Sequence, residues 1–180
     1  MSSPISQPLS LVFNKFEQHW QSSAYPKVGY DEQWLSPCII GEPEQLEVSW
    51  KPVLREDKGD FSGIERALEI ALHPSIKAFY GEYFSETLAV DFQNNRIELV
   101  QAWNEQDFEM LLENIIGHVL MQRRLKQKET VFIASTEDEM QVVSIDNDSG
   151  EVVLEQLGKG IDRVLAKTLD EFVAKFELCD

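Results

Sequence analysis

Three histidines are the first residues in this chain that could support acid–base or metal chemistry: His19, His73 and His118. Their positions do not fit the H-E-x-x-H pattern, in which two histidines one helical turn apart can bind a metal ion. His118 lies seven residues after Leu111, near the apolar face of a predicted helix. A general base needs a positioned partner, and the sequence indicates none for His118. We therefore expect His118 to be a packed or hydrogen-bonded structural histidine.

The chain also lacks the short motifs that position a nucleophile or a phosphate group. It contains no G-x-S-x-G sequence, no phosphate-binding glycine loop and no dinucleotide-binding fingerprint. Its two cysteines, Cys38 and Cys179, are far apart, form no metal-binding pattern and are expected to stay reduced. Cys38 follows a proline in a short apolar insert, which favours an inert, buried thiol. These observations predict a protein that is not an enzyme and has no cofactor or metal site.

The acidic residues are more informative. The chain has 32 Asp and Glu residues against 16 Lys and Arg residues, for a net charge of −16. A phosphate backbone would be repelled by that charge, so we expect no nucleic-acid binding. The charge favours basic partners, although it could also serve solubility alone.

Carboxylates gather at a few places along the chain. The Glu-Asp-Glu run at residues 137–139 directly follows a predicted strand. The three carboxylates could therefore form a local negative field that attracts lysine and arginine. Glu65 and Glu69 lie one turn apart on a predicted helix, as do Glu109 and Glu113. The alternative interpretations are a solvated turn for the run and exposed helix faces for the two pairs.

The elements that must position these side chains centre on residues 104–135. Apolar residues recur at helical spacing from Phe108 to Val119, and Ile116 and Leu120 widen the stripe, so this helix should be well buried. Asn104 is a suitable N-cap for it. The apolar run at residues 131–134 shows no alternation and predicts a strand covered on both faces.

The same patterns predict the other elements. Helices are expected over residues 9–20, over 64–84 with a break at His73, and from Thr168 to Phe176, and the pair Ser62 and Glu65 forms a possible capping box. Strands are expected at 46–50, as an edge strand, at 88–92 and 97–99, and at 141–145 and 152–157. Residues 24–44 should be loop, and the polar stretch 55–60 should be a mobile surface loop.

Together these elements predict an α+β fold, a single domain over residues 1–180 with a mostly antiparallel sheet and helices packed against it. No apolar run approaches the roughly 20 residues that a membrane span needs. The first ten residues have neither a basic region nor a long apolar core, so we expect no signal peptide there.

Several stretches in order along the chain resemble the SecY-interacting Syd family of Gram-negative bacteria. The matching stretches are SPCII at residues 36–40, ERALEIALHPSIKAFY at 65–80, ENIIGH at 113–118, RLK at 124–126, VFIAS at 131–135 and SGEV at 149–152. None of them is a catalytic signature.

This resemblance implies a SUKH-like fold and a cytoplasmic protein that reaches the cytoplasmic side of the inner membrane only by docking peripherally on SecY, the channel of the Sec translocase. We also expect the protein to be a monomer. The resemblance implies a regulatory or quality-control role, in which an acidic concave face binds basic cytosolic loops of SecY. Cytosolic loops of membrane proteins carry excess Lys and Arg, which suits an acidic partner. The residues we expect on the acidic face are Glu65, Glu69, Glu113, Glu137, Asp138 and Glu139.

The resemblance also leaves a second function open. The SUKH group includes immunity proteins that inhibit nuclease toxins, and an acidic surface would suit a basic nuclease. A neighbouring toxin gene would favour that interpretation, whereas the family stretches quoted above favour SecY.

Overall fold

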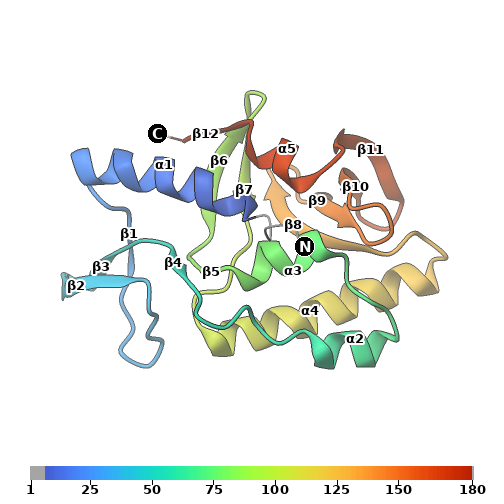
Figure 1. Ribbon diagram of the computed structural model, residues 1–180, viewed down its shortest axis with the longest axis horizontal. Coiled ribbons are helices and arrows are strands. Elements are labelled where there is room, and N and C mark those ends of the chain that lie inside the picture. The colour runs from blue at the N-terminus through green and yellow to red at the C-terminus, as the bar shows by residue number, and fades with distance from the viewer. Residues whose placement is uncertain (1–6, 180) are drawn as a thin grey trace, which may run out of the picture.

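A seven-stranded antiparallel sheet forms the centre of the protein (Figure 1). The structure is a computed structural model that describes residues 7–179, so the first six residues, where no signal peptide is expected, lie outside the described range. The strand order is β11-β10-β9-β8-β7-β6-β12. The strands are β6 (Leu88–Phe92), β7 (Asn95–Leu99), β8 (Thr130–Thr136), β9 (Gln141–Asp146), β10 (Val152–Gln156), β11 (Gly160–Ala166) and β12 (Phe176–Leu178).

Five helices and two small sheets complete the described chain. The helices are α1 (Pro8–Ser22), α2 (Ser62–Leu68), α3 (Pro74–Gly81), α4 (Glu105–Arg124) and α5 (Leu169–Val173). In one small sheet β3 (Glu47–Trp50) lies between β1 (Lys27–Gly29) and β2 (Ile39–Glu44), and in the other β4 (Val53–Leu54) pairs with β5 (Tyr83–Phe84). The α+β fold with an antiparallel sheet is therefore confirmed.

The central helix and strand are where the sequence places them. The Asn104 side chain accepts a hydrogen bond from the Asp107 N–H at 2.8 Å and caps α4. Phe108, Ile115 and Val119 are at most 1% exposed, and residues 131–134 of β8 are buried or half-buried on both faces. Leu120, in contrast, is 46% exposed, so its assignment to the buried stripe was wrong. It follows Val119 by about 100° around the helix, which turns it away from the sheet.

The helix predicted over residues 64–84 is two shorter helices followed by a strand. Helix α2 ends at Leu68 because Glu69 adopts left-handed geometry, with φ 54°. The predicted capping box is wrong: Ser62 is the first helical residue, and its N–H donates to the Asp60 carboxylate at 2.9 Å. The break at His73 is confirmed, since its side chain caps α3 by accepting from the Ser75 N–H.

Short strands account for most of the other differences. The predicted edge strand at residues 46–50 is central in its sheet, and the preceding loop contains β1 and β2. Leu46 lies outside β3, in a turn with φ 68°. Phe176 belongs to β12, which pairs with β6, rather than to the last helix. Strands β1 and β12 have three residues each, too few to show alternation, and their backbone pairing with distant partners creates them.

Candidate functional site

The six acidic residues expected on the binding face form two separate groups. Glu65 and Glu69 belong to the α2 segment, which lies alongside α4, the helix that carries Glu113 (Figure 1). Arg123 of α4 connects the two helices by donating to the Leu68 carbonyl at 2.6 Å, beside Glu69. Glu69 and Glu113 are exposed. Glu65 is already engaged, because its carboxylate pairs with the Lys77 ammonium at 2.8 Å and accepts the Leu72 N–H at 3.0 Å.

The second group, residues 137–139, lies at the other end of strand β9. The turn between β8 and β9 carries these three exposed acids. The turn at the opposite end of β9 contacts the α2–α3 connection, because the Asn147 side chain accepts from the His73 N–H and donates to the Ala71 carbonyl. The length of the six-residue strand β9 therefore separates residues 137–139 from the α2–α3 connection that follows Glu65 and Glu69. The six residues do not form one continuous cluster.

The turn that carries Glu137, Asp138 and Glu139 is held by its own hydrogen bonds. Asp138 accepts from the Met140 N–H at 2.9 Å, and its own N–H donates to the Thr136 hydroxyl at 3.1 Å. A cleft of about 250 Å³ beside the turn is lined by Glu137 and Asp138 together with Arg96 and Arg163. Two cations therefore lie near this group and reduce its negative field.

The stretch predicted to be a mobile surface loop begins with a buried arginine. The Arg55 side chain is fully buried, and its guanidinium lies over the rings of Phe84 and Phe108, 4.3 and 4.6 Å from their centroids. It also pairs with Glu105 at 2.7 Å and Asp57 at 3.0 Å. The prediction was wrong for Arg55, because a planar cation can be buried between aromatic rings when carboxylates balance its charge.

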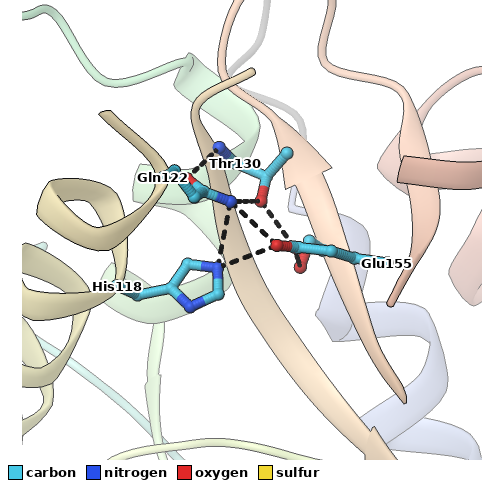
Figure 2. A network of polar contacts seen from close by, with 5 residues as sticks. His118, Gln122, Thr130 and Glu155 are labelled. Carbon is cyan, nitrogen blue, oxygen red and sulfur yellow. Dashed lines mark hydrogen bonds and ion pairs between the residues drawn. The ribbon is translucent and has the colours of Figure 1, made fainter. Parts of the chain in front are cut away.

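His118 belongs to a buried polar network between α4 and the sheet (Figure 2). Its Nε2 lies 3.2 Å from Oε1 of Glu155, a residue of β10 that is 0% exposed. Gln122 donates to Thr130 Oγ1 and to Glu155 Oε1, at 2.6 and 2.9 Å. The hydroxyls of Thr130 and Ser144 donate to Glu155 Oε2 at 2.7 and 2.8 Å. A consistent assignment places a proton on His118 Nε2, so that four donors surround one carboxylate.

This network explains the ionisation of Glu155. Burial by itself would raise the pKa of this carboxyl, but the hydrogen bonds from His118, Thr130 and Ser144 outweigh it and hold the pKa at about 2. Both oxygens already accept hydrogen bonds, and the His118 side chain is only 10% exposed. The hydrogen-bonded position predicted for His118 is confirmed.

Sequence reasoning missed the carboxylate partner of His118. Two signals could have indicated it. Gln122 is a polar residue on the apolar stripe of α4, three residues after Val119, and Glu155 is a charged residue at the end of the apolar run Val152–Leu154. Polar side chains at core positions are expected to form hydrogen bonds with one another.

Cys38 has the burial expected for it. It is 0% exposed, and burial raises the pKa of its thiol to about 11. Among the residues described, no helix combines the length and apolar character needed to cross a membrane. The described part of the chain also brings together no three His, Cys, Asp or Glu side chains in an arrangement suited to a metal ion.

Comparison with known proteins identifies the family. The model of the Syd protein family, described as SUKH-2, matches residues 6–177. The chain belongs to the Syd family. A Protein Syd of Psychromonas ingrahamii is 48% identical over 90% of this chain and 89% of its own length. Two more Syd proteins, from Pseudoalteromonas atlantica and Aliivibrio fischeri strain MJ11, are 41% and 46% identical over at least 95% of each chain.

Proposed function

We propose that this Syd-family chain is a non-enzymatic regulatory or quality-control protein that binds basic cytosolic loops of the translocase channel SecY. Binding would hold it peripherally at the cytoplasmic side of the inner membrane, and an acidic surface would make the contact. Family membership is the observation that carries this proposal. The net charge of −16 supports it, because the loops expected as partners are rich in Lys and Arg.

Exposed carboxylates that form no ion pair within the protein would attract the basic loops. Within residues 7–179, no lysine, arginine or histidine forms an ion pair with five of the six expected residues. These five are Glu69, Glu113, Glu137, Asp138 and Glu139. The buried His118–Glu155 pair supports a non-enzymatic role, because its carboxylate already has its hydrogen-bond donors and little of the ring reaches solvent.

We place the first contact at residues 137–139, since three exposed acids at the end of a rigid strand act on one basic loop at once. Each exposed pair should contribute only about 0.2–1 kcal/mol, so affinity should fall in steps as charges are removed. It should also fall with salt, because the Debye length decreases from about 10 Å at 0.1 M to about 3 Å at 1 M. Association should slow more than dissociation accelerates.

The test is a triple variant, Glu137→Lys, Asp138→Lys and Glu139→Lys, titrated against SecY in detergent. The matched control is Glu42→Lys, Glu44→Lys and Glu47→Lys, which changes the net charge equally on exposed residues of the β2–β3 hairpin. Three such pairs sum to about 0.6–3 kcal/mol, so we expect the first variant to lose between about threefold and about 150-fold in affinity. The control should lose much less. Equal losses of affinity in the two variants would contradict a first contact at residues 137–139. Glu69 and Glu113 would then be the next candidates for the contact.

A pull-down from solubilised inner membrane, with this protein as bait, distinguishes a SecY-binding protein from an immunity protein. Recovery of SecY would support the proposed function. Recovery of a basic nuclease without SecY would favour an immunity protein.

A further inference from the structure

A cleft lies between α3 and the segment before α2, and the proposed function assigns no role to it. Its volume is about 460 Å³, within the range of small-ligand pockets. Residues 58–62 form one wall and α3 contributes another. The lining residues are Lys58, Gly59, Asp60, Phe61, Ser62, Glu65, Leu72, Pro74, Lys77, Ala78 and Glu82.

Glu82 is the unusual member of this lining. It is 3% exposed, and neither carboxylate oxygen has a hydrogen-bond partner among the residues that the structure describes. Its backbone is fixed, because its carbonyl accepts the Arg55 N–H at 2.7 Å. The neighbouring Gly81 lets the Lys58 carbonyl approach so closely that any Cβ would collide with it. Residues 55–58 are therefore held against the backbone of Gly81 and Glu82.

Burial of a carboxyl without hydrogen-bond donors costs free energy, because the ionised form has lost its hydration and no hydrogen bond replaces it. Burial raises the pKa of Glu82 to about 7, while Lys58 opposes the rise and Asp170 adds to it. A positively charged group that entered the cleft would supply the missing donors and favour the ionised form.

The surroundings favour a cation over an anion as the entering group. Lys77 is engaged by Glu65 at 2.8 Å, and the lining acids Asp60, Glu65 and Glu82 outnumber the two lysines. Phe61, Leu72, Pro74 and Ala78 provide apolar contacts that suit the aliphatic stem of a long basic side chain.

We propose that this cleft is a subsite for one basic side chain of the partner, with its guanidinium or ammonium group on the Glu82 carboxylate. The subsite rests on the proposed function, since it assigns a place to one Lys or Arg of the bound loop. Arginine should bind better than lysine, because its planar group can donate to both carboxylate oxygens.

The test uses small probes, so it does not depend on SecY. The probes are N-acetyl-arginine amide, the lysine analogue, and the neutral, nearly isosteric citrulline analogue, each titrated into the full chain by NMR. We expect arginine to bind more tightly than lysine and citrulline not to bind. Ionisation of Glu82 should be required, so arginine binding should weaken about tenfold from pH 8 to pH 6.

The variant Glu82→Gln, which keeps the shape of the neutral acid, should lose about tenfold in arginine affinity and most of the pH dependence. The matched control Glu109→Gln, on the exposed face of α4, should bind as the parent protein does. Lys58→Ala tests whether Lys58 competes for Glu82, and it should tighten arginine binding.

Equal arginine binding by the parent protein and Glu82→Gln would overturn the subsite, as would binding of citrulline. If the probes fail while SecY still binds, the subsite alone is wrong. If arginine binds at Glu82 and SecY does not bind, the subsite stands as a site for basic side chains and the proposed partner is wrong.

Discussion

Glu155 is a charged residue inside the sheet, and its neighbours determine whether it stabilises the fold. Four donors, from His118, Gln122, Thr130 and Ser144, reach its two oxygens. A buried polar network that is fully satisfied specifies one arrangement of α4 on the sheet, whereas a partly satisfied one would be costly.

Glu155→Gln should lower the free energy of unfolding by about 3 kcal/mol at pH 7, because the neutral amide turns an NH₂ group toward donors. The pKa of Glu155 is held at about 2, below its ordinary value of 4.5. Its stabilisation is therefore fully present above about pH 4.5 and is lost as the pH falls toward about 2. Urea unfolding between pH 7 and pH 2 measures this difference.

The matched control is Glu113→Gln on the exposed face of α4, which should change stability by less than about 0.5 kcal/mol at each pH. The difference in the free energy of unfolding between Glu155→Gln and the parent protein should decrease from pH 7 to pH 2. A constant difference would contradict the ionised state of Glu155.

At the scale of elements, the segment that joins β4 to α2 has no regular structure but is anchored at its first residue. Arg55 is held between Phe84 of β5 and Phe108 of α4 and pairs with Glu105 at the start of α4. One side chain therefore links three elements. This arrangement explains why a wholly polar stretch follows a fixed path over α3.

Arg55→Ala should destabilise the protein by about 2 kcal/mol, through lost cation–π contacts and lost packing of the side-chain stem. Arg55→Lys should recover less than half of that loss, since an ammonium cannot stack between two rings or reach both carboxylates. Thermal unfolding measures both variants. Arg66→Ala, which removes the same charge from an exposed position of α2, is the control and should be nearly neutral. Full recovery by lysine would show that charge alone is required.

For the whole molecule, the net charge of −16 determines how it meets a membrane. Anionic lipid headgroups create a negative surface potential that repels such a protein. Within the described residues, no helix could provide a membrane-spanning anchor. Under the proposed function, SecY provides the route to the membrane.

Flotation with vesicles tests this expectation. We expect no recovery with protein-free vesicles that contain phosphatidylglycerol, and recovery with the same vesicles once purified SecY is reconstituted in them. Added salt should release the protein from the SecY vesicles, since screening weakens attraction between exposed charges. Equal recovery with and without SecY would contradict the proposed mode of membrane association.

Elements with local signals were predictable from the amino-acid sequence. Helix α4 follows from the spacing of Phe108, Ile115 and Val119 and from the Asn104 cap, and the hairpin of β6 and β7 follows from alternation. The acidic character and the family stretches were also readable from the chain. Helix and strand signals depend on residues within one or two turns, which is why periodicity reveals them, whereas the net charge is a sum over the composition.

Contacts between side chains far apart in the sequence became visible only in the folded protein. The sequence shows Glu155, Arg55 and Glu82 as three charged residues among many, and burial gives each of them a different chemistry. Four donors hold Glu155 ionised, two aromatic rings and two carboxylates hold Arg55, and Glu82 has no donor within the described chain. The packing also placed the acids of residues 137–139 at one end of β9, away from Glu65 and Glu69 near its other end and from Glu113 on α4. Desolvation and hydrogen bonding depend on neighbours in space, and neighbours far apart in the chain leave no periodic signal in it.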